Sequence, residues 1–272
     1  MDAFVLGGGG QLGASEVGML RALLERGIAA DLVVGTIVGA INGAAVASEP
    51  TLAMIQRLQD TWSDIERSDV FAGSFLNRLA TLARTGTHLH GNDALRATIT
   101  EALPIPLIQD LPVRFQCVAA SIESAAEHWF FDGPLVDAVL ASAAVPGILP
   151  PVEVRGEHYI DGGIVNSIPV GRAVEQGART VYVMQVGRVD RPLRAPQRPW
   201  EVARVAFEIS RRHRYAREMA SVPDGVQVHV LPTGGGSAAD DSPLAYRDMA
   251  SATVRLERAY AAARAYLAGS PT

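Results

Sequence analysis

The sequence contains no lysine. All 24 of its basic residues are arginines, against 29 acidic residues, and the formal net charge is −5 over 272 residues. Together with the abundance of alanine, the absence of lysine indicates a bias of GC-rich coding rather than a functional signal. The negative balance leaves no overall positive field to collect phosphates, so it argues against a nucleic-acid partner.

Cysteine and long apolar runs are also scarce. The single cysteine, Cys117, excludes an internal disulfide, and its place in the apolar run Phe115–Ala120 predicts a buried structural thiol. No stretch of about 18 apolar residues occurs, so we expect no membrane-spanning helix. The first residues show neither a basic region nor an apolar region ending in a cleavage site. We therefore expect no secretory signal and a cytoplasmic location, with peripheral membrane contact left open.

Hydrophobic residues make up 48% of the chain, which is enough for a large buried core. Short apolar runs alternate with segments whose apolar residues recur at helical spacing. The runs that predict strands are 3–6, 32–34, 113–121, 127–131, 152–160 (as a hairpin), 180–186 and 226–231. The segments that predict helices are 16–26, 38–47, 51–67, 93–103, 135–144, 170–176, 201–220 and 246–267. This alternation predicts one α/β domain over residues 1–272, layered around a largely parallel sheet.

The first motif is Gly35-Thr36-Ile37-Val38-Gly39, between a predicted buried strand and a helix of small residues. A nucleophile elbow has this form, a strained strand-to-helix turn whose middle residue projects into a site. Its glycines are needed because side chains there would collide with the neighbouring strand and helix. The usual pattern is G-x-S-x-G, and here Ile37 stands at the serine position. Taken alone, the motif indicates no more than a tight turn packed on a core.

The second motif is a glycine run, Gly7–Gly10, between the first predicted strand and the first predicted helix. Consecutive backbone N–H groups with no side chains in the way suit an oxyanion hole. Residues 8–13 also match the G-x-G-x-x-G dinucleotide fingerprint. The acidic residue expected about 20 positions further on, at the end of the next strand, is missing, since Asp31 precedes its strand. A nucleotide-binding protein is therefore a more distant alternative.

The third motif is Asp161-Gly162-Gly163, at the end of a predicted strand. An aspartate in a glycine-rich turn is often only a turn former. As a catalytic group, Asp161 would act as a general base that takes the proton of a serine hydroxyl within hydrogen-bond reach. The three motifs are specific together where each alone is not.

The order of these motifs resembles the patatin-like phospholipase family, and the resemblance covers roughly residues 3–190. It extends to the segments 38–44, after the elbow, and 141–147, before the aspartate strand. The resemblance implies a three-layer α/β/α fold with a mostly parallel central sheet. It also implies hydrolysis of carboxylic esters of acyl lipids by a Ser–Asp dyad, without a metal or an organic cofactor.

The resemblance assigns roles to individual residues. Gly8, Gly9 and Gly10 would line the oxyanion hole, and Asp161 would be the dyad base. Gly35, Gly39, Gly162 and Gly163 would be the glycines of the elbow and of the aspartate turn. Leu12 stands where the family often has Arg or Lys, so the resemblance implies no charge from that position.

Ile37 changes what the resemblance implies about activity. Isoleucine has no nucleophilic atom and no proton to give Asp161, so the acyl-enzyme route is closed, a loss that can be on the order of 10⁶ in rate. Thr36 carries the nearest hydroxyl, but neighbouring residues at such a turn point in different directions. We therefore expect the chain to be inactive or strongly impaired.

Two origins are consistent with Ile37. It is either an introduced or recent substitution in a working hydrolase, since a single base change (AGC to ATC) suffices, or the mark of a natural pseudoenzyme. The intact glycine loop and Asp161 favour the first, because a long-abandoned site need not keep them. The main alternative is a non-catalytic protein that binds acyl lipids or serves as a scaffold.

Three further features carry weaker expectations. The irregular segment 71–90 is either a lid over an acyl groove or a surface excursion packed by its own apolar residues. His88 and His90 indicate a solvated loop rather than a zinc site. The basic stretch 211–214, with Arg217, predicts a solvated helix face or, as an alternative, a contact for anionic lipid head groups.

Overall fold

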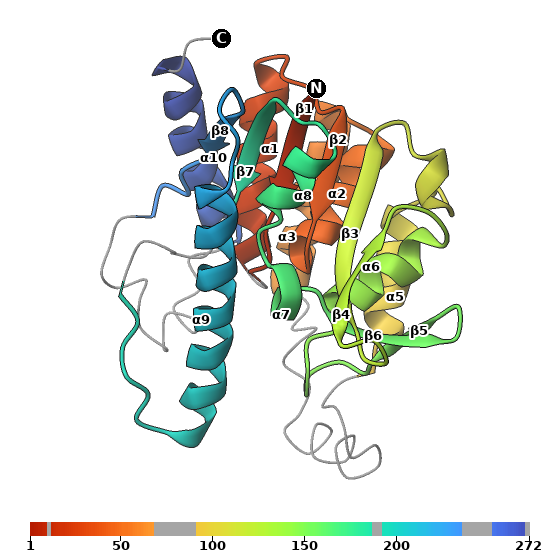
Figure 1. Ribbon diagram of the computed structural model, residues 1–272. Coiled ribbons are helices and arrows are strands. Elements are labelled where there is room, and N and C mark those ends of the chain that lie inside the picture. Colours follow the sequence, from red (N-terminus) through yellow and green to blue (C-terminus); the bar gives the residue numbers. More distant parts are fainter. Residues whose placement is uncertain (10–11, 68–90, 187–191, 236–251, 270–272) are drawn as a thin grey trace.

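A computed structural model describes residues 1–9, 12–67, 91–186, 192–235 and 252–269 (Figure 1). Its strands form one sheet with the path β5-β6-β3-β2-β1-β7-β8, and β4 pairs with β3 off this path. The pairs among β3, β2, β1, β7 and β8 are parallel, whereas β4, β6 and β5 join in antiparallel pairs. The strands are β1 (Asp2–Leu6), β2 (Leu32–Gly35), β3 (Arg114–Ser121), β4 (Ala126–Phe130), β5 (Val152–Val154), β6 (Glu157–Asp161), β7 (Thr180–Met184) and β8 (Gln227–Val230).

Helices cover both faces of the sheet. One face carries α1 (Gly13–Glu25), α2 (Val38–Ser48), α3 (Leu52–Arg67), α5 (Asp93–Ala102), α6 (Leu135–Ala143) and α10 (Ala252–Gly269). The opposite face carries α7 (Gly163–Asn166), α8 (Val170–Glu175) and α9 (Pro199–Ala220). None of the helices that the structure describes is long and apolar enough to cross a bilayer.

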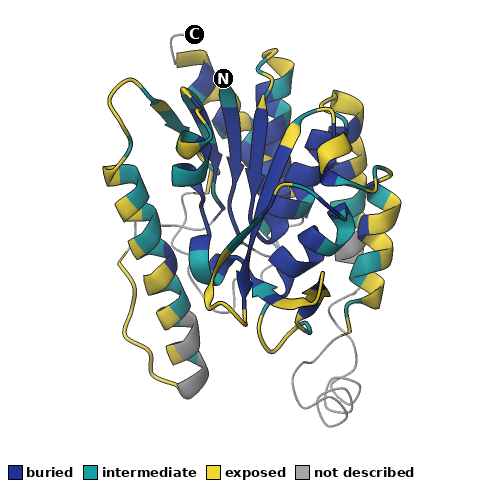
Figure 2. Cartoon of the chain, turned by 45° about the vertical axis from the view of Figure 1, so that its right-hand side comes forward, coloured by how far each residue is buried: buried dark blue, intermediate teal, exposed yellow. Residues whose placement is uncertain are grey.

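The sheet is the buried centre of the molecule, as the dark strands of Figure 2 show. In β1, Phe4 and Leu6 belong to the core on the α1 face, and Ala3 and Val5 to the core on the α8 face. All four are fully buried. A parallel strand covered on both faces has this near-continuous apolar character, which is why its sequence shows a run rather than an alternation. The expected three-layer α/β/α fold is therefore confirmed.

Most of the expected elements are present within a few residues of their expected ends. Cys117 is completely buried, which confirms the structural thiol, and burial raises its pKa. Helix α1 begins at Gly13, three residues before the apolar periodicity. The short helix α7 and a 3₁₀ turn at Ile108–Asp110 were not expected. The segment 71–90, with His88 and His90, lies outside the described residues.

Candidate active site

The turn at residues 35–39 is held by close backbone packing. A Cβ built at Gly35 would lie 2.5 Å from the carbonyl oxygen of Gly39 and 2.6 Å from the Cα of Ala40, both in α2. A Cβ at Gly39 would collide with the backbone of Leu6 in β1. Helix α2 therefore starts directly against the sheet, and only glycine permits this approach at both positions.

Ile37 has a strained backbone at the centre of this turn. Its φ of 56° and ψ of −118° lie in a region that L-residues rarely adopt and that is least suited to a β-branched side chain. Its N–H donates a 3.0 Å hydrogen bond to Oγ of Ser142, a completely buried serine of α6. From the sequence, Ser142 is only one residue of the segment 141–147. Its hydrogen bond to the turn is visible only in the structure.

The hydroxyl of Thr36 is already engaged. Its Oγ1 donates a 3.0 Å hydrogen bond to the carbonyl oxygen of Asn166 in α7, and its side chain is fully buried. The hydroxyl of the residue that precedes the nucleophile position therefore points into α7.

Asp161 ends β6 and is almost completely buried, with 1% of its surface exposed. Its Oδ1 accepts a 2.6 Å hydrogen bond from the N–H of Gly163. Burial raises the pKa of this carboxyl to about 7, although the hydrogen bond from Gly163 opposes the rise. A carboxyl with a pKa near 7 exchanges its proton readily at neutral pH, as a general base must.

The sheet register explains how Asp161 comes to the elbow. Gly35, which precedes the elbow, pairs with Cys117 of β3, and Asp161 pairs with Ala119, two residues further along the same strand. Gly162 then packs against the carbonyl of Val118, where a Cβ would collide. The two motifs therefore meet through their shared neighbour β3.

The side chain of Ile37 lies between the glycine loop and the aspartate turn. Its Cδ1 would be 2.5 Å from a Cβ built at Gly8 and 2.7 Å from one built at Gly163. The Oδ1 of Asp161 would be 3.0 Å from that same Cβ at Gly163. Ile37, Gly8, Gly163 and Asp161 thus border one small volume, and Ile37, with 8% of its surface exposed, fills it.

The glycine loop has fewer available donors than its sequence suggests. The N–H of Gly8 donates to the carbonyl of Ser167 at 2.9 Å, so this amide is engaged within the protein. In the described part of the chain, the N–H of Gly9 donates no hydrogen bond. Gly10 lies outside the described residues. Among the described residues of the loop, the amide left for an oxyanion hole is therefore that of Gly9.

The loop leaves no room for a pyrophosphate at Gly8 and Gly9. Ile37 occupies the space in front of Gly8, and Val186 occupies the space in front of Gly9. Dinucleotide sites depend on glycine to let the backbone approach the pyrophosphate. Here the chain's own side chains take that space, which argues against the nucleotide-binding alternative.

The expectation for the basic stretch needs a correction at Arg211. This residue is 4% exposed, and its Nε donates a 3.1 Å hydrogen bond to Oγ of Ser167, next to Gly8. Its guanidinium also pairs with Glu208 at 3.2 Å. Arg211 is therefore not part of a solvated face, because helical periodicity turns it inward with Phe207, toward the turn after Asp161.

A second buried carboxyl, Glu16, lies in α1 and contacts Asn42 of α2. It is completely buried, and this burial raises its pKa well above the usual range, although a 2.8 Å hydrogen bond from Asn42 opposes the rise. Asn42 also donates to the carbonyl of Gly13 at 3.1 Å and accepts from Nε1 of Trp62 at 3.1 Å. This network could not be predicted from the sequence, because an acidic residue in the first turn of a helix is common at the surface.

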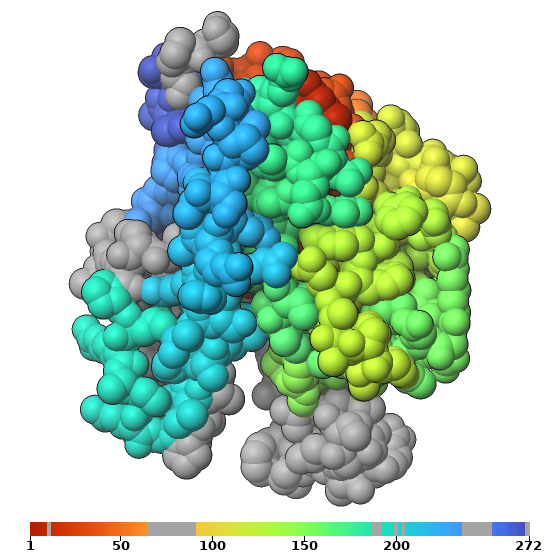
Figure 3. All heavy atoms as spheres, viewed as in Figure 1, coloured from red at the N-terminus to blue at the C-terminus, as the bar shows by residue number. Residues whose placement is uncertain are grey.

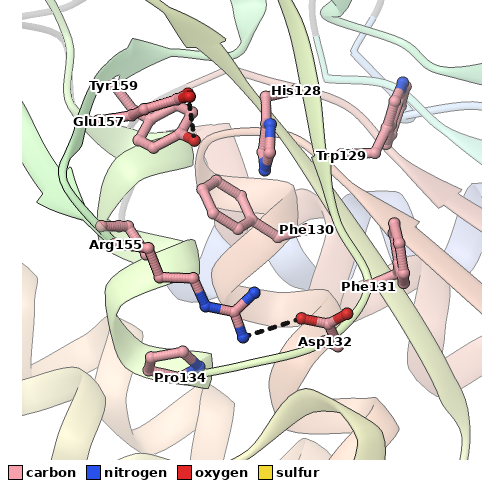
Figure 4. Close-up of a pocket in the computed structure, with 10 residues that line it drawn as sticks. His128, Trp129, Phe130, Phe131, Asp132, Pro134, Arg155, Glu157 and Tyr159 are labelled. Carbon is pink, nitrogen blue, oxygen red and sulfur yellow. Dashed lines mark hydrogen bonds and ion pairs between the residues drawn. The ribbon is translucent and has the colours of Figure 1, made fainter.

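A pocket of about 280 Å³ lies elsewhere, between β4 and the β5–β6 hairpin (Figure 4). Arg155 and Asp132 form an ion pair of 3.0 Å at its edge, and Tyr159 donates to Glu157 at 3.0 Å. The rings of His128, Phe130 and Tyr159 contact one another. Neither Ile37 nor Asp161 lines this pocket, so it is distinct from the candidate active site.

Several known proteins are similar to this chain in sequence. Patatin-like phospholipase domain-containing protein 7 of Rattus norvegicus is 32% identical over 190 residues, which cover 69% of this chain and 14% of that protein. Protein 6 of the same description from Homo sapiens is 33% identical over 190 residues, covering 69% and 13%. Lysophospholipase NTE1 of Candida glabrata is 31% identical over 189 residues, covering 68% and 10%. The matched regions are thus about a seventh or less of the length of these relatives.

The crystal structure of VipD from Legionella pneumophila has a similar fold. It matches with a TM-score of 0.50 and 15% identity, over 98% of this chain and 66% of that one. At this identity the likeness concerns the fold alone. A family model described as patatin-like phospholipase matches residues 4–174, more than half of the chain and all three motifs. The chain therefore belongs to the patatin-like phospholipase family.

Proposed function

We propose that this chain is a hydrolase scaffold for acyl esters of lipids, laid out for a Ser–Asp dyad, and that it is inactive or strongly impaired because Ile37 occupies the nucleophile position. The single observation that carries the proposal is the backbone of Ile37. A φ of 56° is a strained conformation that does not stabilise an isoleucine. The chain nevertheless keeps the turn that projects a nucleophile, and the N–H of Ile37 is hydrogen-bonded to Ser142.

The surroundings support each step that a serine at position 37 would take. Its Oγ would bond to the ester carbonyl carbon while its proton moved to Asp161, whose pKa of about 7 suits that transfer. The amide of Gly9 would stabilise the oxyanion. The alcohol would leave with the proton held by Asp161. Water would then attack the acyl-enzyme and give a proton to Asp161, which would pass it to the leaving Oγ as the fatty acid is released, so that the serine and the carboxylate are both restored.

The substrate class follows from the relatives. Their descriptions are phospholipase and lysophospholipase. The region that the family model matches, residues 4–174, includes the elbow and Asp161. We infer that an acyl lipid, a phospholipid or lysophospholipid, is the ester for which the scaffold is laid out.

A p-nitrophenyl ester assay on three forms of the chain tests the proposal. The unaltered chain should show little or no release of nitrophenol, whereas Ile37→Ser should gain activity. Adding Asp161→Asn to Ile37→Ser should abolish that gain, because the base is then lost while the serine remains. If Ile37→Ser is folded and silent, the hydrolase scaffold is wrong.

That silent result would favour the alternative, a non-catalytic acyl-lipid-binding protein. The packing of Ile37 against Gly8 and Gly163 is the observation in its favour, since a filled site is stable without a nucleophile. A fluorescent fatty acid titrated into the unaltered chain would measure such binding directly. NAD and ATP would be titrated into the same chain in parallel. If neither gives a binding signal, the nucleotide-binding alternative is excluded.

A further inference from the structure

Helix α9 has an inner face that borders the candidate site. A Cβ built at Gly163 would lie 3.0 Å from Cζ of Phe207, next to Asp161. One turn further on, Arg211 bonds to Ser167. Near the end of the helix, Glu218 accepts from Asn166 at 2.8 Å. The inner face of α9 is therefore a wall of the site.

The opposite face of α9 carries an exposed row of residues that are apolar apart from His213. Its residues recur every three or four positions along the helix, and all six are exposed: Val202, Ala206, Ile209, His213, Ala216 and Ala220. Val202 is 53% exposed and Ile209 55% exposed, although both are large hydrophobic residues. The helix lies along one side of the molecule (Figure 3), and exposed residues recur along its outward side (Figure 2).

The charges of this helix are segregated. Two of its three carboxylates pair within the helix, Glu208 with Arg211 and Arg212 and Glu218 with Arg214, whereas Glu201 accepts a hydrogen bond from the N–H of Gln197 in the preceding segment. Arg217 is exposed beside the row.

The segment 192–198, which leads into α9, is also exposed and combines apolar residues with arginines. It contains no acidic residue and carries Leu193 and Arg194. We call this segment and the exposed row with Arg217 the outer surface of α9. In a chain with a net charge of −5, the described residues of this surface include apolar side chains and arginines with no acidic residue among them, and the nearby carboxylate of Glu201 accepts a hydrogen bond from the N–H of Gln197.

We propose that the outer surface of α9 docks on an anionic lipid bilayer. Val202 and Ile209 would enter the boundary between head groups and acyl chains, while the flanking arginines would reach lipid phosphates. A bilayer suits this surface because it offers an extended apolar layer and diffuse negative charge, and each arginine near such a surface contributes about 1 kcal/mol. The site on the inner face of the same helix would then lie about 10 Å from the bilayer, one helix diameter away. This last consequence rests on the proposed function, whereas docking itself does not.

Vesicle sedimentation with the full chain tests the proposal. The chain should pellet with vesicles of phosphatidylcholine mixed with phosphatidylglycerol, and far less with phosphatidylcholine alone. Ile209→Asp should weaken binding to the mixed vesicles by tenfold or more. Leu52→Asp is the matched control, because Leu52 is 49% exposed at the start of α3 on the opposite side of the sheet, and it should bind like the unaltered chain.

A charge arm completes the design. Arg194→Gln combined with Arg217→Gln should weaken binding to the mixed vesicles by roughly 25-fold, about fivefold for each arginine. Circular dichroism melts would establish that every variant is folded.

Three outcomes would overturn the proposal. They are equal binding to both kinds of vesicle or to neither, an equal loss in Leu52→Asp, and self-association by light scattering that Ile209→Asp abolishes without any vesicle binding. The last outcome would assign the surface to a second copy of the chain. Because the chain tested keeps Ile37, the vesicle result is independent of whether Ile37→Ser hydrolyses esters.

Discussion

Ile37 occupies the space that a side chain at Gly8 would need, with its Cδ1 2.5 Å from the position of that side chain's Cβ. The nucleophile position and the glycine loop are therefore in direct contact. Apart from Ile37, the nearest atom to a Cβ at Gly8 is Oγ of Ser167, at 3.2 Å. The contact can be measured because each residue can be changed separately.

Gly8→Ala should destabilise the unaltered chain by about 1–3 kcal/mol, because the new methyl group forces Ile37 aside in a packed core. The same change in an Ile37→Ala background should cost much less. Urea unfolding of the unaltered chain, the two single variants and the double variant gives the coupling free energy between the two positions, which we expect to be at least about 1 kcal/mol. Additivity within about 0.5 kcal/mol would mean that the two residues are not in contact.

The backbone at Ile37 predicts an unusual order of stability between two small substitutions. At ordinary positions glycine is less stable than alanine by about 0.5–1 kcal/mol. At a φ of 56° and ψ of −118° the alanine Cβ is strained whereas glycine is not, so Ile37→Gly should be as stable as Ile37→Ala or more stable. Thermal melts compare the two directly.

The matched control is Ala47→Gly, at a fully buried position within α2. It should show the ordinary order, with glycine less stable by about 1 kcal/mol. If Ile37→Gly is less stable than Ile37→Ala by the same amount as at this control, the elbow is not strained.

Asp161 should make stability depend on pH between about 4 and 7. Its folded pKa of about 7 lies above its usual value, so the folded state keeps a proton that the unfolded state has lost in this range. Stability is therefore highest below the unfolded pKa and falls as pH rises toward 7. Each pKa unit corresponds to about 1.4 kcal/mol, so the full effect is a few kcal/mol.

Asp161→Asn removes this ionisation and should gain stability relative to the unaltered chain as pH rises from 5 to 8. Denaturant unfolding at several pH values measures the difference between the two proteins. Because Glu16 is present in both, its own titration cancels in that difference. Parallel curves for the two proteins would show that Asp161 is not buried as described.

Much of the fold was predictable because the spacing of apolar residues indicates which faces of a strand or helix are buried. The runs at 3–6 and 32–34 are apolar throughout, and both strands are buried on two faces. Helix α7 was not predictable, since its four residues are too short for any periodicity. The prediction that Arg211 is solvated was wrong, because it rested on the charge of the adjacent arginines. Arg211 lies four residues after Phe207 on α9, and this helical spacing turns both side chains inward.

The sequence by itself determined that position 37 has no nucleophile, since the identity of a side chain fixes its covalent chemistry in any fold. It also placed glycine at both ends of the elbow. The contacts of Gly35 with α2 and of Gly39 with Leu6 show why no other residue fits there. Only the tertiary structure decided that Asp161 meets the elbow, that its pKa rises, and that the amide of Gly8 is engaged. These depend on strand register and burial, which are set by contacts between residues far apart in the chain.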